Sequence, residues 1–465
     1  MIPAAITAAN RFGLGARPGE LTAIGSDARG WLSRQITGTR PVPQEIAGLP
    51  TSATALQTFA KALQQRRKQR DDTDKDDNAA KRTENGRKQI AAMYQEQVAA
   101  RYRLAIRTEE PFRERLVHFW TNHFAVSADK AQVVGLAGTL ENEAIRPHLQ
   151  GRFVDLLLVV EAHPAMILYL DNQASIGPNS PLAQRAAKRA NGERKLDINE
   201  NLAREILELH TLGVNGGYTQ ADVTTFARAL TGWSIAAARG KQSERAGQFE
   251  FREPAHEPGA KRILGKSYKE EGVAQPRAVL QDLAVHPATA RHIATKLARH
   301  FIADDPPRSA VDRLAKVFRD TDGDLPSLHR ALVESPEAWQ QGAVKFKTPH
   351  DFVVSTFRML DFVPQQPQQI LAPFQLLGQR PYTPGSPAGW PDTAGQWDGP
   401  DALLKRIEWA SAVGKRMGSK VQPIEVGAQS LGTALAERTR VAISRAESAA
   451  QGMALLLASP EFQRR

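Results

Sequence analysis

The chain has 465 residues, of which 41% are hydrophobic and 24% are charged, with a formal net charge of +11 and no cysteine. The lack of cysteine excludes disulfides, thiolate zinc sites, iron–sulfur clusters and cysteine nucleophiles, and no run reaches the ~18 apolar residues that a membrane-spanning helix needs. Arginine is spread along the whole chain without interleaved aromatic residues. The positive charge therefore predicts solubility and no nucleic-acid interface.

The first residues, MIPAAITAANRFG, have neither a basic leader nor a long apolar core. The sequence as it stands therefore predicts no secretory signal, and the compartment stays open between the cytoplasm and an exported form that starts upstream of Met1. The stretch GLGARPGE follows, with three glycines. No strand precedes it and no βαβ unit surrounds it, so it is not expected to bind a dinucleotide.

Residues 64–88 form a run in which nearly every residue is charged or polar, with both signs mixed. This composition predicts a solvent-exposed insertion, part helical and part disordered, with no chemistry of its own.

A helix is predicted to start at Pro111, because proline suits the first helical position. One polar face of this helix is expected to carry Glu114, Arg115, His118, Thr121 and Asn122. His118 and Asn122, four residues apart, can act together. His123 lies ~140° from His118 and cannot share one metal ion with it, so it is predicted to be a core histidine satisfied by a backbone group.

Residues 199–213, NENLAREILELHTLG, are predicted to form the central helix of the protein. Asp197 or Asn199 can cap its start, and Gly213 is placed to end it. At ~100° per residue, one side is apolar and includes His210, a second predicted core histidine. The other side carries polar residues, namely Asn201, Arg204, Glu205 and Glu208.

Glu205 and Glu208 lie ~60° apart on this helix and are candidates for acid–base partners or metal ligands. The alternative is a solvated face that carries an Arg204–Glu208 pair at i,i+4 spacing.

Further along, QFEFR and RILG have the alternating pattern of short strands, and we expect them to pair as a hairpin through the loop HEPGAK. The following helix, HPATARHIATKLARHF, carries a stripe of His292, Lys296 and His300, one residue per turn. The stripe is predicted to bind an anionic group or to face the carboxylates of residues 199–213. The alternatives are an exposed helix flank or buried ion pairs.

Residues 364–400 are rich in Pro, Gly and Gln and are predicted to form a long irregular loop. Its two tryptophans, Trp390 and Trp397, are candidates for stacking on a sugar or another ring. Packing of the loop onto the body of the protein is the alternative.

Five segments together resemble the uncharacterised bacterial family called domain of unknown function 1800. They are NRFGLGARPGE from Asn10, HFWTNHFAVS from His118, HPAMILYLDNQASIGPNS from His163, ENLAREILELHTLGVNGGYTQADVTTFARALTGW up to Trp233, and GWPDTAGQW from Gly389. The resemblance implies a helical protein that is often exported and whose gene often lies beside that of a second uncharacterised exported family. It implies no established activity.

We predict one mostly α domain over residues 1–465, a globular bundle or array of helical hairpins with a small β-hairpin and long loops. The predicted function is that of a hydrolase-like enzyme, able to use a divalent metal, with a polar Glu/His/Arg pocket for a polar or saccharide-like substrate. The proposed catalytic residues are Glu205, Glu208, His118 and His292. The proposed substrate-binding residues are Asn122, Asn201, Arg204, Lys296, His300, Trp390 and Trp397, and metal ligands are not assigned.

The alternative function is that of a non-catalytic helical module that works with a partner protein from a neighbouring gene. A pocket shared by the carboxylates of residues 199–213 and the histidine stripe would favour the enzyme. Local pairing of those groups would favour the module.

Overall fold

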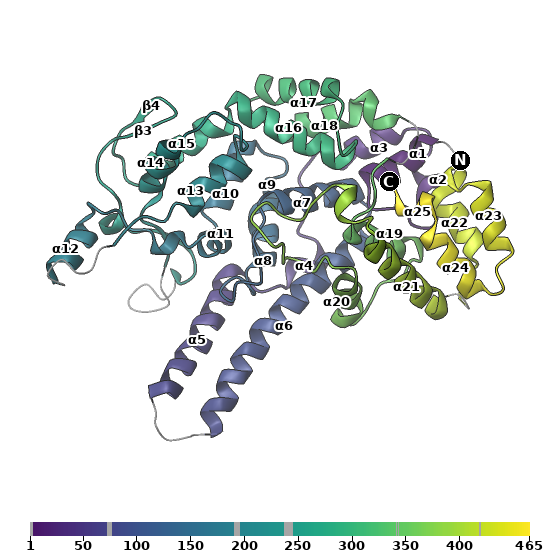
Figure 1. Ribbon diagram of the computed structural model, residues 1–465, viewed down its shortest axis with the longest axis horizontal. Helices are drawn as coiled ribbons and strands as arrows, with labels where there is room; N and C mark the ends of the chain where they lie inside the picture. Colours follow the sequence, from purple (N-terminus) through teal and green to yellow (C-terminus); the bar gives the residue numbers. More distant parts are fainter. Residues whose placement is uncertain are drawn as a thin grey trace.

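The computed structural model describes residues 3–71, 77–189, 196–236, 245–340, 342, 344–417 and 420–465, of which residues 3, 65–71 and 77–84 are described by their backbone alone. The described chain is mostly helical, with two small two-stranded sheets, so the predicted fold class is confirmed (Figure 1). None of the helices in these ranges is both long and apolar enough to cross a membrane.

The N-terminal third builds short helices and then one long hairpin. The elements are α1 (Pro3–Thr7), the π-helical turn η1 (Ala8–Phe12), α2 (Glu20–Ile24), α3 (Ala28–Arg34), α4 (Gln44–Ala47), α5 (Ser52–Asp71) and α6 (Asp77–Arg107). Helices α5 and α6 run side by side and project from the body (Figure 1). The charged insertion predicted at 64–88 falls mainly on side chains outside the described residues.

The central third surrounds α7 and contains the segment at residues 199–213. Its helices are α7 (Pro111–His123), α8 (Ala137–Thr139), η2 (Leu140–Ile145), α9 (Arg146–His148), α10 (Phe153–Glu161), α11 (Pro164–Tyr169), η3 (Asn172–Ala174), α12 (Pro181–Arg189), α13 (Asn201–Glu205), η4 (Ile206–His210) and α14 (Gln220–Leu230). Local signals set several starts: Pro111 opens α7, and a capping box of Thr219 and Asp222 opens α14.

The sequence predicted one regular α-helix at residues 199–213, and this prediction is wrong. The segment is α-helical to Glu205 and then continues as the π-helical turn η4, so its side chains depart from the expected 100° spacing. The Asn199 side chain accepts a hydrogen bond from the Asn201 N–H at its start, and Gly213, with φ +84°, follows its end.

The strands pair differently from the predicted hairpin. Strand β1 (Trp233–Ile235) pairs with β2 (Phe249–Phe251), and β3 (Lys261–Ile263) pairs with β4 (Lys266–Tyr268), both antiparallel. The predicted pairing of QFEFR with RILG is therefore wrong. The physical reason is the turn between β3 and β4: Leu264 and Gly265 both have positive φ, as a two-residue hairpin of matched twist requires.

The C-terminal part returns to helices, most of them paired. They are α15 (Ala274–Ala284), α16 (Pro287–Phe301), α17 (Arg308–Asp320), α18 (Leu325–Glu334), η7 (Pro336–Trp339), α19 (Pro349–Met359), α20 (Pro367–Leu376), η8 (Ala394–Gln396), α21 (Pro400–Met417), α22 (Pro423–Leu431), η9 (Gly432–Ala434), α23 (Glu437–Ser444), α24 (Ala449–Ala458) and α25 (Pro460–Gln463), with η6 (Glu253–Ala255) beside β2. Helix α20 interrupts the predicted loop at 364–400, because Pro367 starts a helix that buries Ile370 and Phe374.

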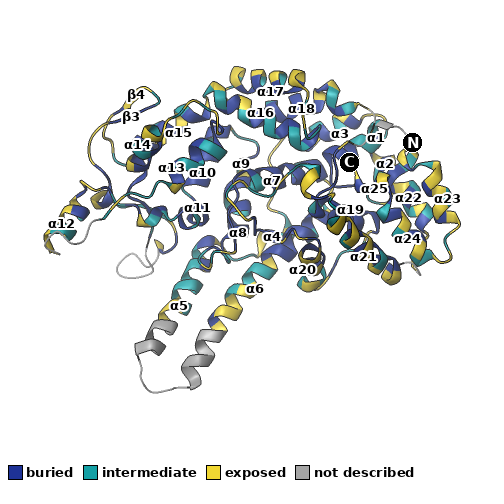
Figure 2. Cartoon of the chain, in the orientation of Figure 1, coloured by how far each residue is buried: buried dark blue, intermediate teal, exposed yellow. Residues whose placement is uncertain are grey.

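Helix α7 lies in the middle of the molecule and is buried along most of its length (Figure 2). Its apolar face belongs to a continuous core in which Phe12, Phe112 and Phe301 are in mutual ring contact, with centroids 5.6 to 6.0 Å apart. Its polar face is buried as well, because a wall of other elements covers it. That second face forms the candidate site.

Candidate functional site

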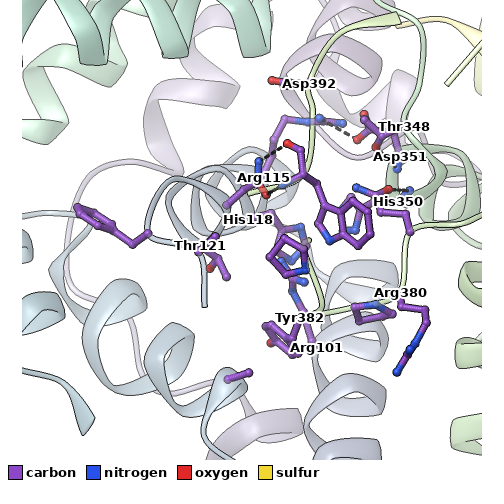
Figure 3. Close-up of a pocket in the computed structure, with 18 of the residues that line it drawn as sticks. Arg101, Arg115, His118, Thr121, Thr348, His350, Asp351, Arg380, Tyr382 and Asp392 are labelled. Carbon is purple, nitrogen blue, oxygen red and sulfur yellow. Dashed lines mark hydrogen bonds and ion pairs between the residues drawn. The ribbon is translucent and has the colours of Figure 1, made fainter. Parts of the chain in front are cut away.

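A cavity of about 90 Å³ lies against the polar face of α7, enclosed by α6, the end of α16, the start of α19 and the segment 379–392 (Figure 3). This volume holds several water molecules or the reacting end of a substrate. The polar residues that line it are Arg101, Tyr102, Arg115, His118, Thr121, Asn122, His300, Thr348, His350, Asp351, Gln379, Arg380, Tyr382, Trp390 and Asp392.

Behind His118, two buried arginines neutralise two buried glutamates. Arg146 contacts Glu114 through two hydrogen bonds of 2.6 and 2.9 Å, and Arg101 Nε lies 2.9 Å from Glu141 Oε2. Burial alone would raise the pKa of Glu114, but the Arg146 guanidinium outweighs it and holds that pKa well below its usual value. Glu114 is therefore a carboxylate at neutral pH.

Glu141 is positioned by an irregular helix turn. It lies on the π-helical turn η2, and its Oε2 accepts a 3.0 Å hydrogen bond from the Thr121 hydroxyl of α7. π-Helical turns occur frequently at functional sites because the extra residue redirects a side chain. The turn thus carries Glu141 from a neighbouring segment to the polar face of α7.

Within the described part of the chain, Glu114, His118 and Glu141 form a group that could hold a metal ion, since one ligand atom from each lies within 4.8 Å of the others. Each glutamate is already paired with an arginine, so the cluster is electrically neutral with a neutral imidazole. A divalent cation would add two positive charges beside two guanidinium groups. The three ligand atoms are suitable for a metal ion, but repulsion from the two arginines disfavours its binding.

On the opposite side of the cavity, Asp351 is held by two arginines. Thr348 caps α19, Pro349 is its first residue, and Asp351 therefore lies in the first turn. Arg115 Nη1 and Arg465 Nε each lie 2.9 Å from an Asp351 oxygen. Burial would raise the pKa of Asp351, and the two arginines lower it well below its ordinary value.

His300 and Asp392 form a hydrogen-bonded pair at the cavity, with Nδ1 2.6 Å from Oδ2. Burial lowers the pKa of His300 to about 4, although Asp392 opposes that shift. Burial would raise the pKa of Asp392, but His300 and Lys345 bring it down to about 2. At neutral pH the pair is a neutral imidazole beside a carboxylate, so Nδ1 donates to Asp392 and Nε2 keeps its lone pair.

Four buried polar atoms of the cavity lining form neither a hydrogen bond nor an ion pair with another described residue. They are His118 Nδ1, His300 Nε2, His350 Nε2 and Trp390 Nε1. Buried polar atoms are normally hydrogen-bonded, so a group of them around one cavity indicates where a polar ligand binds. They include both acceptors and a fixed donor, the indole N–H.

Four residues predicted from the sequence line this cavity, namely His118, Asn122, His300 and Trp390. Asn122 uses its amide to hold the loop: its Nδ2 donates to the Trp390 carbonyl at 2.9 Å, and its Oδ1 accepts from the Trp390 N–H at 2.7 Å. Trp397 donates to the Pro391 carbonyl and packs beside Trp390, with ring centroids 6.1 Å apart. Asn122 and Trp397 thus position the loop.

The polar residues of the 199–213 segment lie outside the cavity lining. Arg204 pairs with Glu200 at 3.1 Å and with Glu208 at 3.3 Å. The Arg204–Glu208 pair at i,i+4 spacing, the alternative to a catalytic face, is therefore present. Asn201 is exposed. Burial raises the pKa of the half-buried Glu205 above its usual value.

The histidine stripe of α16 is divided between two surroundings. His300 reaches the cavity, whereas His292 Nε2 bonds to the Leu209 carbonyl at 2.9 Å. Lys296 forms no hydrogen bond or ion pair with another described residue, and burial lowers its pKa to about 8. The three residues of the stripe therefore do not share one set of surroundings.

The two predicted core histidines are both buried, with different partners. His123 Nε2 bonds to the His210 carbonyl at 3.1 Å, as predicted for a ring satisfied by a backbone group. His210 instead pairs with the buried carboxylate of Glu161 at 2.8 Å, so its predicted backbone partner is wrong. Glu161 comes from α10, a contact that no local pattern reveals.

Several lining residues were missed by the sequence reasoning, namely Arg101, His350, Asp351, Tyr382 and Asp392. Asp392 lies within GWPDTAGQW, between the two tryptophans that the sequence indicated as candidates. The dipeptide His350-Asp351 follows a Thr-Pro helix start, a signal for an ordered, acidic first turn.

The model of a family described as "Protein of unknown function (DUF1800)" matches residues 7–464, nearly the whole chain. No curated protein and no solved structure matches the chain. The match includes the segments of α7, residues 199–213 and the 389–397 loop that carried the resemblance. The chain therefore belongs to the DUF1800 family.

Proposed function

We propose that this protein is a hydrolase whose general base is His300, acting on an ester or similar acyl bond of a polar, saccharide-like substrate. The observation that supports this most directly is the His300–Asp392 pair, whose Nε2 is buried at the cavity without a protein partner among the described residues. A neutral imidazole oriented by a carboxylate is suited to remove a proton from water.

In the proposed reaction a water molecule hydrogen-bonds to His300 Nε2. His300 takes one proton from the water, and the water oxygen attacks the acyl carbon. The tetrahedral intermediate collapses, the bond to the leaving oxygen breaks, and the imidazolium returns its proton to that oxygen. Asp392 keeps the imidazole ring in one orientation and stabilises the imidazolium until it returns its proton.

Negative charge that develops on the acyl oxygen would be stabilised by the cationic lining. Arg101 and Arg115 are buried, and each is fixed by a carboxylate, Glu141 and Asp351 respectively. Fixed charges in a low-dielectric site do not have to reorganise during the reaction. Trp390 adds an aromatic wall and an N–H donor, a combination that suits a sugar ring at the mouth of the cavity.

The test is a panel of chromogenic substrates: 4-nitrophenyl acetate, 4-nitrophenyl phosphate and 4-nitrophenyl glycosides. We expect turnover of the acetate, and a loss of roughly 10²- to 10⁴-fold in His300→Gln, the range that a general base contributes. His292→Gln is the matched control, because this histidine lies on the same helix and bonds only to a backbone carbonyl. Full activity in His300→Gln would overturn the proposal.

Metal analysis of the purified protein separates this mechanism from a metal-assisted one. We expect no stoichiometric metal in the wild type, because arginines neutralise Glu114 and Glu141. A bound metal that is lost in His118→Ala would assign the chemistry to the Glu114–His118–Glu141 cluster instead.

A second candidate function is that of a partner-binding module, favoured by an exposed apolar stripe on α21. Leu403, Leu404 and Ile407 lie on this helix with exposed fractions of 38%, 56% and 51%. Contiguous exposed apolar residues often mark protein contacts. Co-purification with the product of the neighbouring gene tests this function, and Leu404→Glu is expected to abolish a real contact there.

A further inference from the structure

A second and larger cavity, of about 580 Å³, lies on the other side of the buried arginine–glutamate pairs. It is bounded by residues 39–51, α6, α7, η2 and α9. Its volume is within the range of small-molecule binding sites. Glu114 and Arg146 line this cavity, whereas His118 lines the first one, so the two cavities are separated by a few side chains.

One wall of the second cavity is apolar and the other is polar. The apolar wall comes from the segment after Thr39 and from neighbouring helices; its members are Pro41, Val42, Pro43, Ile46, Ala47, Leu49, Pro50, Leu104 and Pro147. The prolines restrict the backbone of this segment, so the wall is formed before a ligand arrives. The polar wall is formed by α7, η2 and α9.

The charged groups of the polar wall are paired, with one exception. Arg40 pairs with Glu110 at 2.6 Å, and Arg146 pairs with Glu114 at 2.6 Å. Arg113 lines the cavity and forms no hydrogen bond or ion pair with another described residue. Burial lowers its pKa, although the group stays charged at neutral pH. The Glu110 and Glu114 carboxylates act on Arg113 at longer range, but neither forms an ion pair with it, so this half-buried guanidinium can pair directly with an incoming anion.

Glu143 is the remaining acid of the lining and does not serve as a counterion of Arg113. It accepts hydrogen bonds of 2.7 Å from both the N–H and the hydroxyl of Ser52, and it lies 3.3 Å from His163 Nε2. Nearby, Asn142 Oδ1 is a buried acceptor without a hydrogen-bond partner among the described residues. The wall thus offers a cation for an acid group and an acceptor for a hydroxyl or amide N–H.

We propose that the second cavity binds a small organic carboxylate with an apolar body and a hydroxyl group. The carboxylate pairs with Arg113, the body lies against the proline-rich wall, and the hydroxyl donates to Asn142. This inference concerns a separate site and does not depend on the proposed hydrolase activity. It assigns a ligand class to residues of α7 and η2 that the first cavity does not use.

The probes are three compounds of one shape: 4-hydroxyphenylacetate, its neutral amide 4-hydroxyphenylacetamide, and the cation tyramine. Binding to the full chain is measured by isothermal titration calorimetry, with saturation-transfer NMR for weak ligands. We expect the carboxylate to bind at least about tenfold more tightly than the amide, because a charged hydrogen-bond pair exceeds a neutral one by about that factor. We expect no binding of tyramine.

Arg113→Gln should weaken carboxylate binding at least about tenfold. Arg330→Gln, at an exposed arginine of α18 that lines neither cavity, is the matched control and should bind as wild type. Val42→Asp places a negative charge on the exposed rim and should also weaken binding. Equal thermal unfolding midpoints would show that the variants are folded.

Three results would overturn the inference. The first is equal affinity for the carboxylate and the amide, and the second is unchanged affinity in Arg113→Gln. The third is loss of binding in His300→Gln with binding retained in Arg113→Gln, which would place the ligand in the first cavity.

Discussion

Two sets of helix carboxylates in this protein have the same residue types and opposite surroundings. Glu208 pairs with Arg204 one turn away, and their side chains remain 27% and 35% exposed. Glu114 pairs with Arg146, 32 residues away, and these side chains are only 4% and 9% exposed. The first pair is a solvated i,i+4 contact, and the second connects two helices inside the molecule.

The difference shows why a polar helix face is an ambiguous signal. The face of residues 199–213 is partly exposed, and Arg204 pairs there with Glu200 and Glu208. The face of α7 has a similar pattern but is covered by α19 and the 379–392 segment, which bring Asp351, His350 and Asp392 to it. Desolvation makes the second face chemically distinctive, because buried groups have shifted pKa values and strong pairings.

Acidification is expected to have the largest effect, because it charges the buried histidines of the α7 side. Burial is the first cause that lowers the pKa of six of them, namely His118, His123, His292, His300, His329 and His350. In the unfolded chain these groups bind protons near pH 6.5, while the folded protein keeps them neutral. Their stabilising contribution is therefore complete above pH 6.5 and is lost progressively below it, down to about pH 4 for His292 and His300.

Each histidine contributes a loss of up to about 1.4 kcal/mol per pH unit, so several together reduce the free energy of unfolding by several kcal/mol between pH 6.5 and 5. Guanidinium unfolding at pH 7.5, 6.5 and 5.5 measures this loss. In His300→Gln, the dependence of the free energy of unfolding on pH should decrease by the equivalent of about one bound proton. A guanidinium unfolding midpoint that is the same at pH 7.5 and 5.5 would contradict the inference that the buried histidines are neutral.

The next largest effect is expected from Glu114→Gln, which leaves the buried Arg146 with only its longer, 3.5 Å contact to Glu141. Breaking a buried ion pair from one side costs about 3–5 kcal/mol in the free energy of unfolding. Replacing both partners, as in Glu114→Leu with Arg146→Met, should recover much of the loss, because no buried charge remains unpaired. A single variant as stable as the wild type in guanidinium unfolding would show that the pair is not buried in solution.

Gly389→Ala should have an intermediate effect by separating the tryptophan loop from α7. Gly389 has φ +83°, and an added Cβ would lie 2.3 Å from the Asn122 carbonyl oxygen. Strain of this kind costs about 1–3 kcal/mol and should change the tryptophan fluorescence of the loop. Gly385→Ala is the control in the same loop, since its Cβ meets no atom within 4 Å. Equal effects of the two substitutions would argue against the contact with Asn122.

The smallest effect is expected from Glu208→Gln on the 199–213 segment. Exposed i,i+4 ion pairs contribute about 0.3–0.5 kcal/mol, so the unfolding midpoint should barely change. Hydrolysis of the chromogenic panel should also be retained, because Glu208 does not line the cavity. Loss of hydrolysis in a stable Glu208→Gln protein would return the chemistry to this segment.

The sequence alone determined the features that depend on neighbouring residues. Pro111 and the Thr219–Asp222 capping box defined helix starts, because a cap is satisfied within one turn. The mostly α fold, the family and the grouping of His118 with Asn122 on one helix face followed from the same local patterns.

Only the tertiary structure decided which polar face is buried and which residues complete it. His300 and Asp392 are 92 residues apart, and Arg115 meets Asp351 from a helix that is still more remote in the sequence. The π-helical turns and the pairing of β3 with β4 also differ from what local patterns predicted. Burial and long-range pairing depend on how whole elements pack, and the side-chain spacing within one helix carries no information about the surface that will cover it.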